Sequence, residues 1–292
     1  MGRIAITVGD SLGIGEEIVT KALSKLNLSR EEIIIIGKKI GDYDFIDVGN
    51  KDNGKFCYDC LTLACEMAKK GEITALVTAP VSKEALYKAG YKFSGQTEIL
   101  DKFLKGEAEM LFVARDLRVM LLTRHLSVAK VPSAINEEMI IEKTLRLNMF
   151  LRDKLKIENP KIAFCALNPH AGEGGILGKE EIEIINPALE KLRKKGINVL
   201  GALSADGLFA HVGKRYLKKE KQEYDAIIST YHDQALGAIK ALAFDEVVNT
   251  TIGLEIIRTS PSSGTAYDIA GKGIADPESM IAAIRLAATL NG

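Results

Sequence analysis

Apolar residues along the chain follow two spacings that alternate from one end to the other. Between stretches of helical period lie short runs rich in Ile, Val and Ala, which predict β-strands over 3–9, 32–37, 73–80, 161–167, 225–230 and 246–253. Apolar residues three or four positions apart predict amphipathic helices over 14–25, 57–71, 134–152, 179–195 and 277–290. Strands that alternate with helices favour α/β layers around a largely parallel sheet.

The segment 110–123 breaks this alternation. It reads MLFVARDLRVMLLT, two apolar stretches on either side of a polar RDLR, which is typical of an antiparallel strand pair. We interpret it as the passage between two domains. The predicted domains are 1–95 plus 255–292, which would bind a cofactor, and 96–254, which would bind metal and substrate and form a dimer.

Composition limits the kinds of partner. The chain has 292 residues, of which 47% are hydrophobic, enough for one large or two medium domains. Its 39 basic and 39 acidic residues leave no net field that would favour nucleic acid or an anionic membrane. No apolar run is long enough to cross a bilayer, and the first residues lack a secretory pattern, so we expect a cytoplasmic protein.

Two glycine-rich turns are candidate ligand sites. Gly9, Gly13 and Gly15 follow the first predicted strand and would let backbone amides approach a ligand, although a plain strand-to-helix turn fits equally well. The second turn, 168–181, reads NPHAGEGGILGKEE. Glu180 and Glu181 at its end are expected to favour the first turn of the next helix.

Three of the four histidines follow predicted strands. His125, His170 and His232 each stand just beyond an apolar run, and loops at strand ends of an α/β sheet share the rim where ligands bind. A single histidine at such a place more often has no function. Three neutral imidazoles suit a divalent transition metal that keeps positions open for substrate. His211 lies among lysines and is expected on the surface.

The C-terminal segment carries the first resemblance. SGTAYDIAGKGIADP contains Gly264, Gly271 and Gly273, and Asp276 followed by a proline starts the last predicted helix. This stretch resembles the adenosine-binding loop of the isopropylmalate and isocitrate dehydrogenases, which bind NAD without the GxGxxG pattern. The chain itself has no GxGxxG after its first strand.

The whole chain is similar to the 4-hydroxythreonine-4-phosphate dehydrogenase family of pyridoxal phosphate biosynthesis. The motifs that carry this resemblance are, in order, ITVGDSLGIG, VTAPVSKEAL, FSGQTE, TRHLSVAKVPSAI, NPHAGEGG, SADGLF and YHDQALGAIK. The resemblance implies two α/β/α domains with mixed, largely parallel sheets, of the isocitrate/isopropylmalate dehydrogenase-like fold, with an active-site cleft between the domains. It also implies a homodimer whose active site is completed across the subunit interface.

The resemblance further implies roles for individual residues. The divalent metal would be held by His125, His170 and His232, with zinc expected first and cobalt, magnesium, manganese and nickel also compatible. The residues that would contact substrate are Gln96, Thr97, Lys240, Asn249 and Arg258. Those that would bind the cofactor, NAD or alternatively NADP, are Gly264, Thr265, Asp268 and Gly271. The candidate bases are Lys240, Asp206 and Asp233, and for the two aspartates a helix cap or a structural hydrogen bond explains the residue equally well.

The implied reaction is the NAD-dependent oxidation, with decarboxylation, of 4-phosphooxy-L-threonine to 3-amino-2-oxopropyl phosphate. The chain departs from the family at Gln96, where a histidine is usual, and a glutamine cannot carry positive charge. Two alternatives therefore stay open. One is a related dehydrogenase of 4-phospho-D-threonate or 4-phospho-D-erythronate, and the other is a non-catalytic protein that binds a nucleotide or metabolite.

Overall fold

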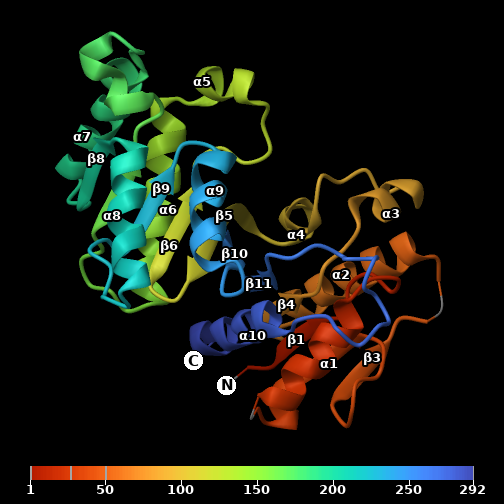
Figure 1. Cartoon of the computed structure of the whole chain (residues 1–292). Helices are drawn as coiled ribbons and strands as arrows, with labels where there is room; N and C mark the ends of the chain where they lie inside the picture. The colour runs from red at the N-terminus through yellow and green to blue at the C-terminus, as the bar shows by residue number, and fades with distance from the viewer. Residues whose placement is uncertain (1, 27, 50, 292) are drawn as a thin grey trace. The chain divides into compact units, whose positions relative to one another are not determined.

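The computed structural model describes residues 2–26, 28–49 and 51–291 (Figure 1). The chain divides into two compact units, with Met1–Ala108 and Asp245–Gly292 in unit 1 and Glu109–Phe244 in unit 2. These borders differ from the predicted ones at 95/96 and 254/255. The helix α4 (Gln96–Phe103) belongs to unit 1 because it packs on α2 (Asn53–Lys69). The strand β10 (Val248–Leu254) belongs there because it pairs with β11 (Ile257–Pro261).

Unit 1 is built on a sheet with the strand order β3-β2-β1-β4-β11-β10. Its first four strands are β3 (Asp44–Asp47), β2 (Ile33–Gly37), β1 (Ile4–Thr7) and β4 (Ala75–Thr78). Neighbouring strands are parallel except β10 and β11. Helix α1 (Gly15–Lys25) packs on α10 (Glu278–Asn291), and α2 packs on α3 (Lys83–Lys88) as well as α4. The fully buried strands β1, β2 and β4 form the centre of the core.

Unit 2 is built on a sheet with the strand order β5-β6-β9-β7-β8. The strands are β5 (Gly106–Ala114), β6 (Leu117–Leu121), β9 (Ala226–Ser229), β7 (Ile162–Cys165) and β8 (Val199–Leu203). The predicted antiparallel pair within 110–123 is confirmed as β5 and β6, and the other neighbours are parallel. Among the helices, α6 (Glu137–Asp153) packs on α7 (Asn186–Lys194), and α8 (Ala205–Leu217) packs on α9 (His232–Ala243).

The remaining elements are short. They are the turns η1 (Arg30–Glu32), η2 (Val128–Lys130), η3 (Pro169–Gly175) and η4 (Glu181–Ile185) and the helix α5 (Val131–Ala134). Every predicted strand is present, and the helix predicted over 179–195 begins as the π-helical turn η4 and continues as α7. Within the described part of the chain, none of the helices is both long and apolar enough to span a bilayer.

One buried carboxylate joins β5 to α6. Glu109 is 2% exposed, and its two oxygens accept from Lys143 Nζ at 2.6 Å and Arg146 Nη1 at 2.9 Å. Both cations lie on α6, one helical turn apart, so a single carboxylate holds the helix to the strand. This group of one carboxylate and two cations is stabilising only while all three charges are present, because a buried charge without its partner is costly.

We therefore expect Glu109→Ala to lower the free energy of unfolding by about 3 kcal/mol, since it leaves two cations facing an apolar sheet. The measurement is urea denaturation followed by circular dichroism. Glu142→Ala is the matched control, because Glu142 pairs with the same Arg146 at 3.4 Å from an exposed position and such a pair contributes about 0.5 kcal/mol or less. Equal losses in the two variants would contradict this account of Glu109.

Candidate functional site

Two of the three candidate metal ligands lie side by side in unit 2. His125 follows β6 and His232 is the first residue of α9, directly after β9. Because β6 and β9 are parallel neighbours, their carboxyl ends carry both loops to the same edge. The Thr123 hydroxyl donates to the Thr230 carbonyl oxygen at 2.7 Å, which ties the loops together beyond the strands. The two imidazole centroids are 5.8 Å apart.

His232 has a carboxylate partner on its other side. Its Nδ1 lies 2.7 Å from Asp233 Oδ1, so in the neutral ring Nδ1 carries the proton and Nε2 is left as an acceptor. Histidines that bind metals through one nitrogen commonly donate the other N–H to a carboxylate, which orients the ring. The pair therefore suits His232 as a ligand and Asp233 as the residue that orients it.

His170 lies on a turn of unusual handedness. Residues 170–174 of η3 all have positive φ, and His170 itself has φ 51° and ψ 31°. The left-handed region costs a non-glycine residue roughly 1–2 kcal/mol, so three such residues in one turn need support from outside it. That support comes from Glu181, whose Oε1 accepts from the backbone amides of Leu167 and Asn168 at 2.8 Å each.

Glu181 was expected to stabilise the first turn of the next helix. In the structure its side chain instead accepts hydrogen bonds from the turn that precedes the helix. Its Oε2 accepts from Asn168 Nδ2 at 2.9 Å, and the neighbouring Glu180 accepts from the same amide group at 2.6 Å. Although charged, Glu181 is only 1% exposed. Sequence reasoning missed this role because the pattern shows which residues precede a helix and not which way their side chains turn.

His170 lies near a different partner from the other two histidines. η3 packs on α8, and the charge of His170 is one cause of the lowered pKa of Asp206 at the start of that helix. The largest cause is a hydrogen bond that the Ser204 hydroxyl donates to the Asp206 carboxylate. Across residues 2–26, 28–49 and 51–291, no three His, Cys, Asp or Glu side chains are grouped so that they could hold a metal ion. A single chain therefore brings His125 and His232 together and leaves His170 apart.

Lys240 lies on the same helix as His232, eight residues further on. Eight residues of α-helix advance about 12 Å along the axis and turn through about two and a quarter rounds. Lys240 is half-buried on the last part of α9.

Arg258, a predicted substrate contact, is buried in the middle of unit 1. It belongs to β11, between β4 and β10, and is 2% exposed. Its Nε and Nη2 donate to the Thr78 hydroxyl at 2.9 and 2.7 Å, and Nη1 lies 3.5 Å from the Thr251 hydroxyl. Burial lowers the pKa of Arg258 to about 10, against the opposing charge of Glu98, so the guanidinium stays protonated at neutral pH.

The other predicted substrate contacts of unit 1 lie on the elements around Arg258. Gln96 and Thr97 begin α4, and Gln96 Nε2 donates to the Ala79 carbonyl oxygen just beyond β4 at 3.1 Å. Thr97 is buried. Asn249 stands on β10 opposite Ser260 of β11. Arg258 and Asn249 thus lie on the neighbouring strands β11 and β10, and the Gln96 side chain bonds just beyond β4, on the other side of β11.

The predicted cofactor loop packs against the first glycine turn. The Thr265 carbonyl oxygen accepts from Ile14 N at 3.0 Å, and a Cβ added to Gly13 would lie 2.8 Å from that oxygen. Tyr267, in the middle of the loop, donates its hydroxyl to Asp10 at 2.6 Å. The two turns that the sequence marked separately therefore form one surface, and the glycine at 13 is needed for their close approach.

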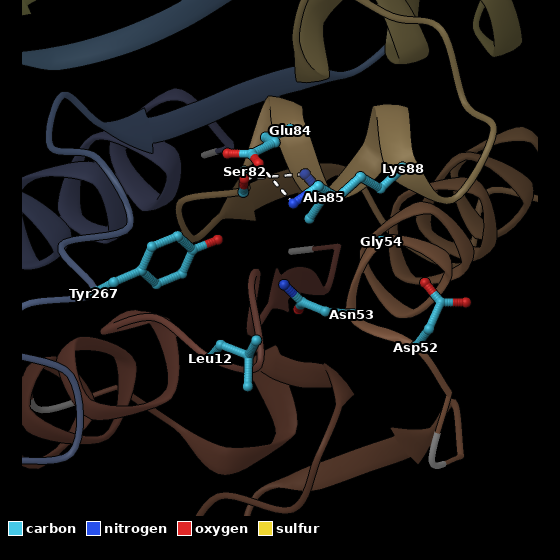
Figure 2. A pocket seen from close by; sticks show the side chains of 9 residues that line it. All are labelled: Leu12, Asp52, Asn53, Gly54, Ser82, Glu84, Ala85, Lys88 and Tyr267. Carbon is cyan, nitrogen blue, oxygen red and sulfur yellow. Dashed lines mark hydrogen bonds and ion pairs between the residues drawn. The ribbon is translucent and has the colours of Figure 1, made fainter.

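A pocket of about 510 Å³ opens beside this loop (Figure 2). Its walls are Leu12, Tyr267, the start of α2 and the start of α3; the lining residues are Leu12, Asp52, Asn53, Gly54, Ser82, Glu84, Ala85, Lys88 and Tyr267. Figure 2 shows the Tyr267 ring and the Leu12 side chain at the same end of the opening. Asn53 supports the floor, because its Nδ2 donates to Asp10 and its Oδ1 accepts from Ser11 N. Sequence reasoning did not single out Asn53.

Comparisons with known proteins identify the family. The sequence profile described as "Pyridoxal phosphate biosynthetic protein PdxA" matches residues 15–287. A 4-hydroxythreonine-4-phosphate dehydrogenase of Caulobacter vibrioides is 46% identical over 231 residues, which cover 77% of this chain and 67% of that protein. The solved structure of the enzyme of the same name from Klebsiella pneumoniae is 31% identical, with a TM-score of 0.85 over 99% of this chain and 98% of the other. The chain belongs to the PdxA family.

The PdxA match confirms the predicted family and fold. An isocitrate dehydrogenase of Methylococcus capsulatus, 15% identical with a TM-score of 0.52 over 98% of this chain and 85% of the other, shares the fold alone. The predicted oxidoreductase of pyridoxal phosphate biosynthesis is confirmed at the level of the family name and of its named dehydrogenases. The roles of the individual PdxA site residues stay predictions.

The support that Glu181 gives to the PdxA histidine turn can be measured without substrate or metal. Glu181→Ala removes the acceptor of two backbone amides, so we expect the amides of residues 168–178 to exchange with deuterium about tenfold faster or more. Glu183→Ala, at an exposed position on the same turn, is the matched control and should leave exchange unchanged. If the amides of 168–178 stayed equally protected in Glu181→Ala, the turn would not depend on this carboxylate.

Proposed function

We propose that the chain is an NAD-dependent, divalent-metal-dependent dehydrogenase. Its substrate would be 4-phosphooxy-L-threonine, oxidised at the secondary alcohol with decarboxylation to 3-amino-2-oxopropyl phosphate. Support for the reaction class comes from the family and from the names of its relatives. Support for an anionic substrate comes from unit 1 itself.

The observation that carries the proposal is the buried guanidinium of Arg258. Among the described residues, its hydrogen bonds go to the neutral hydroxyls of Thr78 and Thr251, and its electrostatic partner Glu98 acts through charge. A buried cation bound mainly to neutral groups is unfavourable unless an anion compensates it. The planar fork of arginine binds phosphate or carboxylate through two parallel hydrogen bonds. A phosphorylated hydroxy acid offers both groups.

The pocket beside the predicted cofactor loop suits a nicotinamide nucleotide. Tyr267 supplies an aromatic face and Leu12 an apolar one, between which a planar ring can stack. Asp52 and Glu84 place carboxylates on the same lining, which would accept from ribose hydroxyls and repel a 2′-phosphate. NAD is therefore the expected cofactor rather than NADP.

The metal would be held by histidines of unit 2. His125 and His232 are close enough to share one ion, and Asp233 orients His232 so that its Nε2 is available. Since His170 is not grouped with them in one chain, we infer that the third imidazole is supplied by a second copy. A bound divalent cation would act as a Lewis acid toward the substrate alcohol and the enolate charge. Zinc is expected first, with cobalt, magnesium, manganese and nickel as alternatives.

Lys240 is our choice for the base among the three candidates. The lowered pKa of Asp206 makes its carboxylate a weaker proton acceptor. Asp233 already accepts from, or shares a proton with, His232. Lys240 is the remaining candidate, and it lies half-buried on α9.

A homodimer would explain the apolar side chains that flank the histidines. Leu126 and Val128, next to His125, are 43% and 67% exposed, and Ile176 and Leu177, on the loop of His170, are 82% and 47% exposed. Large exposed aliphatic residues on two segments of one unit favour a surface that is covered in an assembly. The same segments carry two of the proposed ligands, so an interface there would bring histidines of two copies together.

The first test is a substrate screen with purified protein, NAD and zinc. We expect NADH and carbon dioxide to form with 4-phosphooxy-L-threonine and not with 3-isopropylmalate, because the site is proposed to hold a phosphate. 4-Phospho-D-threonate and 4-phospho-D-erythronate belong in the same screen, since the departure from the usual histidine at Gln96 leaves them open as the second candidate class. Turnover of these two alone would change the proposed substrate and leave the proposed reaction class unchanged. If the zinc-loaded dimer turned over none of these compounds, the result would contradict the proposal that the chain is an enzyme.

The shared metal site predicts complementation between two inactive variants. His170→Ala and His232→Ala homodimers should each lack activity, while a mixed dimer has one intact site, made from His125 and His232 of one copy and His170 of the other. After unfolding and refolding an equimolar mixture, we expect about a quarter of the wild-type activity, because half of the dimers are mixed and each has one site of two. His125→Ala with His232→Ala is the control and should stay inactive. Inactive mixed dimers in the first pair would place all three ligands in one chain.

A further inference from the structure

The predicted cofactor loop lies within a long segment of turns and coil. This segment, residues 262–277, joins β11 to α10. Gly271 and Gly273 have positive φ, 74° and 70°, and Ala266 has φ 46°. A chain rich in glycine has many accessible conformations when it is free, so ordering it has an entropy cost. The single conformation of the loop therefore depends on bonds to the rest of unit 1.

Both ends of the loop are bonded to the first helix or to the turn before it. At the start, the Thr265 carbonyl oxygen accepts from Ile14 N at 3.0 Å. At the end, Glu17 Oε1 accepts from Ala275 N at 2.8 Å. Lys21 Nζ donates to the Ala275 carbonyl oxygen, also at 2.8 Å. These bonds fix the two ends and leave the middle, which lies beside the pocket, to a different anchor.

The middle of the loop is bonded to one buried carboxylate. Tyr267 donates its hydroxyl to Asp10 Oδ2 at 2.6 Å. Asp10 is 1% exposed, and its Oδ1 accepts from Leu12 N at 2.9 Å and from Asn53 Nδ2 at 2.7 Å. The Asp10 amide donates to the Pro80 carbonyl oxygen at 2.9 Å. Asp10 is thus held by the first glycine turn, by α2 and by the segment after β4, and it offers the loop a fixed acceptor.

The Tyr267 hydroxyl is suited to be a permanent donor. Burial first, and then the hydrogen bond to Asp10, raise the pKa of Tyr267 above its usual value, so the phenol keeps its proton at neutral pH. A hydrogen bond to a carboxylate is stronger than one between neutral groups. Figure 2 shows the hydroxyl end of the ring pointing away from the loop backbone and into the opening. The bond therefore fixes the direction of the ring as well as the loop.

We propose that Tyr267 is a positioning residue whose hydroxyl, through Asp10, holds the middle of the cofactor loop in its binding conformation before the cofactor arrives. A nicotinamide nucleotide then meets a ring and a loop that are already ordered, which removes an entropy cost from binding. This role belongs to the hydroxyl and is separate from stacking by the ring. The inference rests on the proposed function for the cofactor and adds the group that orders its loop.

The substitution Tyr267→Phe separates the hydroxyl from the ring. Phenylalanine keeps the aromatic face and loses the donor to Asp10. Tyr224→Phe is the matched control, because Tyr224 lies in unit 2, where its ring is 5.0 Å from Lys161 Nζ and is kept in the variant. For each protein we would measure the deuterium exchange of the amides of 264–275 without ligand. We would also measure kcat and the KM values for NAD and for 4-phosphooxy-L-threonine with zinc bound.

We expect the loop amides to exchange about tenfold faster in Tyr267→Phe, because the middle of the loop loses its anchor. The KM for NAD should rise about tenfold, while kcat and the KM for the other substrate stay at their wild-type values. Tyr224→Phe should change none of these quantities. Unchanged exchange in Tyr267→Phe overturns the inference, and so does faster exchange with an unchanged KM for NAD.

Calorimetric titration with NAD distinguishes a failure of the inference from a failure of the proposed function. If wild type binds NAD and turns over no substrate, the proposed reaction fails, and weaker NAD binding by Tyr267→Phe still supports the inference. Equal NAD binding by the two proteins overturns the inference and leaves the proposed cofactor in place. If wild type binds no NAD, the proposed cofactor and the positioning role of Tyr267 are both wrong.

Discussion

Unit 1 depends on one buried positive charge. Arg258 stands in β11, with a strand on each side, so its guanidinium is removed from water in the part of the fold that is otherwise packed with aliphatic side chains. The neighbouring strands place the hydroxyls of Thr78 and Thr251, rather than apolar groups, against the guanidinium. Because burial leaves the pKa near 10, the charge persists at neutral pH. The sheet is therefore stable around this point only with polar neighbours or a bound anion.

Unit 2 shows the opposite arrangement, in which a buried negative charge supports a strained turn. The left-handed residues around His170 are each less stable than in an ordinary turn, and Glu181 offsets the cost by accepting two backbone amides and a side-chain amide. A Cβ at Gly172 would lie 2.8 Å from Glu181 Oε2, so the glycine lets the turn approach its support. In both units the fold departs from its most stable form beside the candidate site, as functional sites often do.

The sequence predicted those elements whose residues agree with their position. Runs such as IIIIG in β2 and IAFC in β7 are buried on both faces and could hardly be anything but central strands. β11 was missed because IRTSP contains an arginine and a proline, which match neither a strand nor a helix pattern. α4 was missed because its first residues are polar and follow a glycine. These are the elements that carry Gln96, Thr97 and Arg258, so the substrate contacts came from the resemblance and not from periodicity.

Chain position also did not show how the three histidines are grouped. Chain position places all three after strands of one sheet, and the structure agrees that β6, β7 and β9 are neighbours. Chain position does not give the direction of the turn after β7. That direction depends on left-handed φ values and on Glu181, eleven residues after His170. Residue type, chain position and the resemblance together predicted three ligands for one ion, and a single chain brings two of them side by side.

Glutamine in place of the usual histidine at position 96 follows from the same electrostatics. A histidine beside Arg258 would either add a second cation to a buried site or lose its proton to avoid that, and either state depends on pH. A glutamine is neutral at every pH and, with its nitrogen held by Ala79, presents an acceptor. The substitution therefore replaces a group that can carry positive charge with a neutral amide whose oxygen is an acceptor.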